Sequence, residues 1–142
     1  MREMKISELS VGDWVIFRPN DKVFITEPKF TETIARVVGI GRTDVCLEYN
    51  NRGWMAVPLE CISPIPLTAG ILEKNGFEEL KDKSWVGHNH HCHIQQHGSS
   101  WTLLSNKRGF YRTIRFENLA FVHELQNALR LAGVEKEIEV CG

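Results

Sequence analysis

The sequence predicts an α+β protein whose first half is mostly strands and whose second half combines hairpins with two helices. Short runs of β-branched and aromatic residues recur through residues 1–67, separated by Gly, Asn and Asp. Near the end of the chain, apolar residues instead recur at spacings of three and four, which is typical of an amphipathic helix. The 142 residues, 42% hydrophobic and 25% charged, fit an ordinary globular chain of one domain or two small halves.

In the first half, strands are expected at residues 14–17, 23–25, 34–38, 45–49 and 54–57. So many short strands in 67 residues favour a strongly bent sheet of the SH3-like barrel kind, with a four- or five-stranded open sheet as the alternative. Three prolines between residues 57 and 67 cannot donate to a central ladder, so this segment is expected to be an edge or a connector. We therefore divide the chain into an SH3-like subdomain, 1–67, and an α-β-β-β-α subdomain, 68–142, packed together as one compact unit.

The second half begins with a short helix, expected from Ala69 to Asn75 with Thr68 as its N-cap and Gly76 as its stop. Strands follow at residues 85–86, 92–97, 101–105 and 110–116. A final helix carries an apolar stripe and ends at Gly133; the stripe consists of Leu119, Val122, Leu125, Leu129 and Ala132. His123 and Gln126 lie beside the stripe, where we expect hydrogen bonds to the hairpins or to solvent. Residues 135–140 are expected to form a short strand or to fray.

Charge and cysteine usage restrict the setting in which the protein works. Seventeen basic and 18 acidic residues give a net charge of -1, so no global field attracts nucleic acid or an anionic membrane. The N-terminus lacks a secretory pattern and no apolar run is long enough to span a membrane, so we expect a cytoplasmic protein. Four widely spaced cysteines without a Cys-x-x-Cys pair predict reduced thiols, with Cys46 and Cys61 in the core.

Three strings in the sequence resemble a known but functionally undescribed family. They are Leu-x-Val-Gly-Asp-Trp-Val at 9–15, Ile-Pro-Leu-Thr at 65–68 leading into Ile-Leu-x-x-x-Gly-Phe at 71–77, and FVHELQN at 121–127. In order and spacing they are similar to small proteins from phages, prophages and conjugative elements of Bacteroides-type gut bacteria. The resemblance implies an accessory protein of a mobile element. The sequence departs from the family pattern at Ala69 and Gly70, where acidic residues that start a helix are common. The resemblance also does not extend to the His-rich residues 88–97, so any role of those histidines would be particular to this chain.

The His-rich segment at residues 88–97 is a candidate metal site. On a strand, side chains alternate, so His91, His93 and His97 share one face with Gln95. Two imidazoles at i and i+2 can bind one zinc ion if a third ligand comes from a neighbouring strand; copper or nickel would suit the same ligands. The competing interpretation is a solvent-facing hairpin that happens to be rich in histidine. A cofactor is therefore not expected, and a transition metal is the alternative.

The second candidate is a basic hairpin that would contact nucleic acid. No acidic residue interrupts its cations and its tyrosine, which are Lys107, Arg108, Tyr111, Arg112 and Arg115. Cations on such a turn bind phosphates, and the tyrosine ring can stack on a base. A solvated turn is the simpler interpretation, given the neutral overall charge.

Aromatic side chains in the first half supply a third candidate surface. Trp14, Tyr49 and Trp54 can line a partner-binding face, as aromatic residues do on SH3-like barrels. No phosphate-binding glycine loop, nucleophile elbow or metalloprotease motif occurs in the sequence. We therefore expect a non-catalytic binding or adaptor protein whose partner is a protein encoded by the host or by the mobile element. Nucleic-acid binding through residues 107–115 and metal binding through residues 88–97 are the alternatives.

Overall fold

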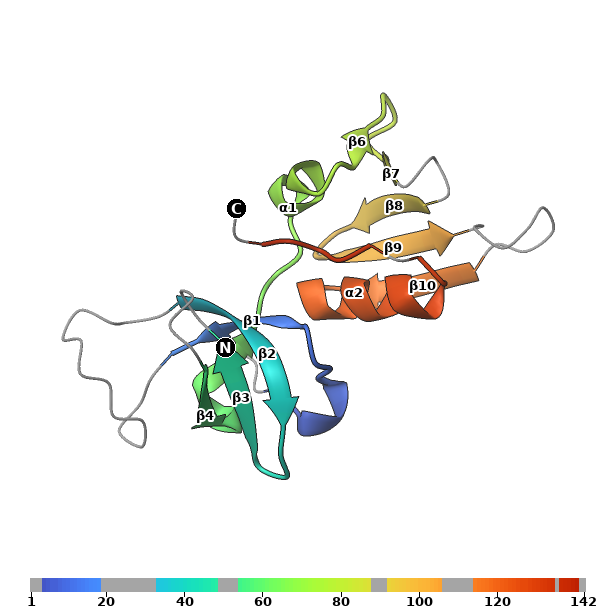
Figure 1. Ribbon diagram of the computed structural model, residues 1–142. Helices are drawn as coiled ribbons and strands as arrows, with labels where there is room; N and C mark the ends of the chain where they lie inside the picture. The colour runs from blue at the N-terminus through green and yellow to red at the C-terminus, as the bar shows by residue number, and fades with distance from the viewer. Residues whose placement is uncertain are drawn as a thin grey trace. The chain divides into compact units, whose positions relative to one another are not determined.

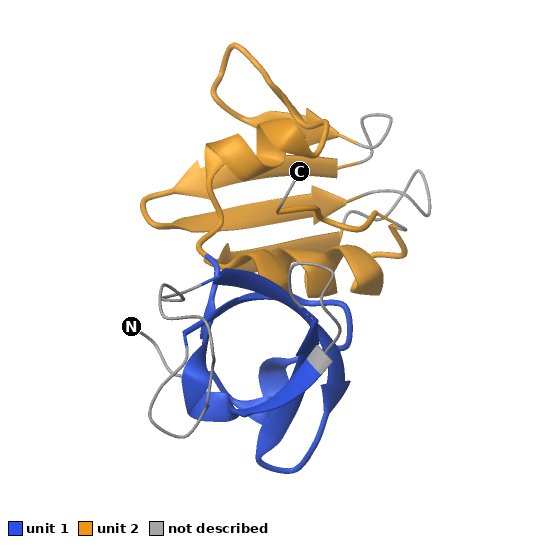
Figure 2. Cartoon of the chain, turned by 60° about the vertical axis from the view of Figure 1, so that its left-hand side comes forward, with its two compact units in different colours: residues 1–65 blue, residues 66–142 orange. Residues whose placement is uncertain are grey.

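The computed structural model describes residues 4–18, 33–48, 54–87, 92–105, 114–134 and 136–140. The chain divides into two compact units, residues 1–65 and 66–142, shown in blue and orange in Figure 2. Each unit is built on a five-stranded antiparallel sheet, and two α-helices belong to the second (Figure 1). The α+β class expected from the sequence is therefore confirmed, with strands predominating.

The sheet of unit 1 has the strand order β4-β3-β2-β1-β5. Its strands are β1 Trp14–Phe17, β2 Thr33–Ile40, β3 Asp44–Glu48, β4 Trp54–Pro58 and β5 Ile62–Pro64. Short 3-10 helices precede β1 at Ile6–Glu8 (η1) and β5 at Leu59–Cys61 (η2). Four of the five predicted strands are confirmed, and the one at 23–25 lies outside the described residues. The proline-containing connector includes β5, which among the described strands pairs only with β1 and so is an edge strand that tolerates proline.

Strict alternation along the strands builds the core of unit 1. Val15 and Phe17 on β1 point inward, as do Val45 and Leu47 on β3, and all four are completely buried. Cys61 is buried among them, as predicted, whereas Cys46 lies on the opposite face of β3 and is only half-buried.

The sheet of unit 2 is a continuous meander in the order β10-β9-β8-β7-β6. In chain order its elements are α1 Ala69–Lys74, β6 Glu78–Glu79, β7 Trp85–Gly87, β8 Cys92–His97, β9 Ser100–Ser105, β10 Ile114–Leu119 and α2 Val122–Leu131. The two-residue strand β6 has no counterpart in the sequence prediction, because a run of two residues carries no periodicity.

The starts and ends of both helices follow local chemistry. Thr68 Oγ1 accepts a hydrogen bond from the Ile71 N–H at 3.3 Å, and Gly76 after α1 has a φ of 86°. Gly133 after α2 likewise has a φ of 79°. The prediction that Leu119 belongs to the apolar stripe of the final helix is wrong. Leu119 ends β10, because Glu124 Oε1 accepts from the N–H groups of Ala120 and Phe121 and so starts α2 at Val122.

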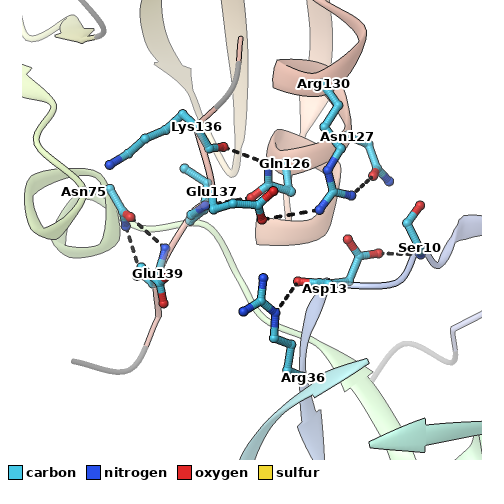
Figure 3. A network of polar contacts seen from close by, with 12 residues as sticks. Ser10, Asp13, Arg36, Asn75, Gln126, Asn127, Arg130, Lys136, Glu137 and Glu139 are labelled. Carbon is cyan, nitrogen blue, oxygen red and sulfur yellow. Dashed lines mark hydrogen bonds and ion pairs between the residues drawn. The ribbon is translucent and has the colours of Figure 1, made fainter. Parts of the chain in front are cut away.

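The C-terminal segment 136–140 is held by two side-chain amides rather than by a strand ladder (Figure 3). Gln126 on α2 donates to Lys136 O at 2.9 Å and accepts from the Ile138 N–H at 2.7 Å. Asn75 at the end of α1 donates to Glu139 O at 2.8 Å and accepts from the Glu139 N–H at 2.7 Å. We call these two residues the amide clamp. Ile138 between its two arms is 1% exposed.

The clamp overturns two expectations from the sequence. The segment 136–140 is held in place but does not form a strand, because side-chain amides bond the main-chain groups that a strand ladder would otherwise pair. Gln126 and His123 are buried rather than placed beside the apolar stripe, and Gln126 bonds the C-terminal segment instead of the hairpins or solvent.

We expect the same substitution, glycine to alanine, to change the free energy of unfolding in opposite directions at two positions in unit 2. A Cβ at Gly87 would lie 2.5 Å from Cδ1 of the buried Phe77 ring, so Gly87→Ala is expected to lower the free energy of unfolding by about 2 kcal/mol. A Cβ at Gly70 in α1 would meet only Thr68 Oγ1 at 3.9 Å, so Gly70→Ala is expected to raise it by up to ~1 kcal/mol. Urea unfolding of the two variants checks both signs, and equal effects would contradict the packing at Gly87.

No helix in the described parts of the chain is long and apolar enough to cross a membrane.

Candidate functional site

The sheet of unit 2 contains a notch where β8 extends beyond β7. On one side, β8 pairs with β9 along its whole length, from Cys92 opposite Ser105 to His97 opposite Ser100. On the other side, β7 covers only residues 92–94. Residues 95–97 therefore have no strand partner on that side within the described part of the chain. Figure 1 labels β7 and β8, the two neighbouring strands that form the notch.

The ladder pattern determines which main-chain groups face the notch. The Leu80 N–H donates to Ser84 O, so the main-chain groups of Ser84 face β6 and those of Trp85 face β8. Ile94 lies opposite Trp85 and therefore presents its N–H and C=O to β7. Gln96 is two residues further along the strand and presents its N–H and C=O in the same direction, into the notch.

An open pocket of about 700 Å³ occupies the notch. Its walls are the turn between β6 and β7, the end of the β8–β9 hairpin and the first residue of α1. The lining residues are Ala69, Glu79, Asp82, Lys83, Ser84, Trp85, Gln95, Gln96, His97 and Gly98. Apart from Trp85, which is 7% exposed, and Ser84, these side chains are exposed and mostly polar. The pocket thus combines uncovered strand main chain with side chains suited to hydrogen bonding.

The Asp82 carboxylate is fixed in its charged form at the edge of this pocket. The Ser84 hydroxyl donates to Asp82 Oδ1 at 2.6 Å, and the Ser84 N–H donates to the same oxygen at 3.0 Å. These bonds lower the pKa of Asp82 below its ordinary value of 3.8. Both bonds from Ser84 end on Oδ1, so neither of them occupies Oδ2.

The same contacts predict how Asp82 titrates. Ser84→Ala removes the hydroxyl donor and keeps the N–H, so the pKa of Asp82 is expected to rise toward 3.8 without reaching it. Because the folded-state pKa lies below the unfolded value, these bonds stabilise the fold above about pH 4 and are lost as the pH falls through the folded-state pKa. NMR titration of the Asp82 side-chain carbon measures both values, and an unchanged pKa in Ser84→Ala would show that the hydroxyl is not the main cause.

Two of the three predicted metal ligands, His93 and His97, are described and lie on β8. The alternation expected for residues 91–97 is confirmed for the described residues: Cys92 and Ile94 are buried, while His93 and His97 are exposed. His97 lines the pocket and His93 does not, and His91 lies outside the described residues. Within the described ranges, no three His, Cys, Asp or Glu side chains are close enough to hold a metal ion.

The predicted nucleic-acid residues fall mostly outside the described part of the chain, namely Lys107, Arg108, Tyr111 and Arg112. Arg115 is described and is exposed on β10. Its Nε lies 2.6 Å from Glu117 Oε1, so an internal carboxylate already neutralises this cation.

The aromatic residues of unit 1 are described only in part. Trp14 on β1 is half-buried, and the Arg36 guanidinium carbon lies 5.4 Å from its ring centre. Arg36 Nε also donates to Gly12 O at 3.3 Å, which fixes the cation over the ring. Trp54 lies on β4 opposite Glu48, but its side chain and Tyr49 lie outside the described residues.

Sequence reasoning overlooked the residues that form the pocket, with the exception of His97. No sequence motif contains Glu79, Asp82 or Gln96, and these residues line one pocket because β8 extends beyond β7. The Asp-x-Ser spacing at 82–84, which is typical of a turn closed by a side chain, was the one available signal. The chain matches no protein-family model, no curated protein and no solved structure.

Proposed function

We propose that this protein is a non-catalytic binding module and that the notch pocket of unit 2 is its partner site. The carrying observation is the open pocket of about 700 Å³ along an uncovered strand edge. A pocket with many polar groups and uncovered main chain is suited to recognising another chain by hydrogen bonds. The partner is a protein encoded by the host or by a mobile element, and the resemblance of residues 9–15, 65–77 and 121–127 supports that setting.

We also propose that unit 1 is an SH3-like barrel. The strand order β4-β3-β2-β1-β5 supports this assignment, as does the 3-10 helix η2 immediately before β5. Barrels of this kind serve protein-binding, nucleic-acid-binding and purely structural roles, so the fold alone selects no partner. The partner site is assigned to unit 2 because the open pocket lies there, along the part of β8 that β7 does not cover.

The test is capture of partners from lysate of a Bacteroides-type host, with and without nuclease. The blocking variant is Ala69→Trp, which places a large ring in the pocket from an exposed position at the start of α1. The matched control is Glu73→Trp, which adds the same ring to an exposed position of the same helix outside the pocket lining. Circular dichroism establishes that both variants are folded.

The expected result is a protein that resists nuclease, is retained by Glu73→Trp and is lost with Ala69→Trp. Equal capture by both variants would overturn the pocket as the partner site. Capture that disappears with nuclease would instead favour the nucleic-acid alternative and direct attention to residues 107–115.

A further inference from the structure

We infer that the notch binds its partner as an added β-strand, an extended peptide that carries a lysine or arginine. This inference rests on the proposed function, because it specifies the ligand of the same pocket. Two features support it, the direction of the main-chain groups of Gln96 and the charge of the pocket, and the length of the uncovered edge limits how the peptide can bind.

The main chain supplies the first recognition element. Gln96 presents an N–H and a C=O into the notch, and these are the two groups with which a strand residue pairs an incoming strand. The Gln96 side chain donates instead to Gly98 O of its own hairpin, at 3.2 Å. An antiparallel or parallel peptide can therefore use the main chain of Gln96 for a hydrogen-bonded pair.

The uncovered edge is short, which limits what it can hold. Residues 95–97 span roughly 10 Å at ~3.3 Å per residue. A peptide gains one hydrogen-bonded pair along this distance, so side-chain contacts must provide much of the affinity. The turn at residues 82–84, across the pocket, is the part of the lining positioned to make them.

Charge defines which side chain the peptide brings. Two carboxylates line the pocket, Glu79 and Asp82, together with one ammonium group at Lys83 and the imidazole of His97. Asp82 is ionised, and both of its hydrogen bonds from Ser84 end on Oδ1, so neither occupies Oδ2. A lysine or arginine on the peptide would bind this oxygen through a charge-assisted hydrogen bond.

The experiment selects peptides from a random displayed library against the full chain and measures the affinity of the enriched sequences. Gln96→Pro removes the N–H that faces the notch, at a position whose N–H is not used in the ladder with β9. Gln96→Ala keeps that N–H and is the matched control. Asp82→Asn removes the charge at constant shape.

We expect enriched peptides to contain a basic residue and to bind about tenfold more weakly to Gln96→Pro than to Gln96→Ala. Asp82→Asn should weaken binding about threefold to tenfold and reduce its salt dependence. If Gln96→Pro does not fold, N-methylation along the peptide main chain tests the same hydrogen bonds with the protein unaltered, and one methylated position should abolish binding.

Other outcomes overturn the inference in distinguishable ways. If Ala69→Trp abolishes the binding of peptides or captured proteins and Gln96→Pro does not change it, the pocket is still the partner site but the partner does not bind as an added strand. Enriched peptides without basic residues would remove the charge assignment. A dimer of this chain that Gln96→Pro dissociates would make a second copy, rather than a foreign peptide, the occupant of the notch.

Discussion

Replacing Trp101 with alanine is expected to lower the free energy of unfolding of unit 2 by about 4 kcal/mol. Trp101 lies on β9 and is 1% exposed, which makes it the largest completely buried side chain described. Its indole Nε1 donates to Leu67 O at 3.2 Å. The substitution therefore opens a large cavity and also leaves a buried carbonyl without its donor. Urea unfolding followed by circular dichroism measures the loss.

Two further variants separate packing from hydrogen bonding at this position. Trp101→Phe keeps a six-membered aromatic ring but removes the indole N–H and the rest of the bicyclic ring, so it should cost about 2 kcal/mol, less than Trp101→Ala. Leu131→Ala on α2 removes an apolar side chain that is 75% exposed and should change stability by less than ~0.5 kcal/mol. A loss in Trp101→Ala no larger than in Leu131→Ala would contradict the buried position of the indole.

Removing one arm of the amide clamp is expected to have the second largest effect. Gln126→Leu should destabilise unit 2 by about 3 kcal/mol, because it leaves both the Ile138 N–H and Lys136 O without their partner. Gln126 is 3% exposed, so water does not readily replace the lost groups. Hydrogen exchange at the Ile138 amide should accelerate more than exchange within β9.

Variants of matched chemistry make this prediction specific. Gln126→Glu keeps an acceptor for the Ile138 N–H but places a second acceptor opposite Lys136 O, so this variant should also lower the stability of unit 2. Part of the lost stability should return at low pH, where the protonated carboxyl can donate to Lys136 O. Arg130→Ala removes an exposed ion pair to Glu137 in the same segment and should cost less than ~0.5 kcal/mol. If Arg130→Ala releases the segment as fully as Gln126→Leu does, the clamp is not what holds it.

The sequence predicted the structure best where a feature depends on the local chemistry of one residue. Thr68, Gly76 and Gly133 mark helix ends because an oxygen at an N-cap and a residue without Cβ at positive φ are local requirements. The alternation of residues 92–97 was readable for the same reason, since the strand period alone puts Ile94 inside and His93 outside.

Features that depend on distant residues were not readable. Asn75 and Gln126 bind main chain that is 64 and 10 to 12 residues away, and an amide side chain gives no sign of its partner in the sequence. The notch depends on the difference in length between two paired strands, which is set by register. Leu119 continued the helical spacing, but the cap formed by Glu124 decided where α2 begins.

The amide clamp also has a consequence for the chemical ageing of the protein. Asn75 is followed by Gly76, and an asparagine before glycine is prone to cyclise and deamidate, because the glycine nitrogen is unhindered. In the fold, that nitrogen donates to Glu73 O at 3.1 Å, and the Asn75 amide is engaged with Ile71 and Glu139. Deamidation would replace the Nδ2 donor with an oxygen facing two carbonyls. We therefore expect Asn75 to deamidate mainly while the chain is unfolded. A molecule that has deamidated refolds without one of the two arms of the amide clamp that hold its C-terminal segment.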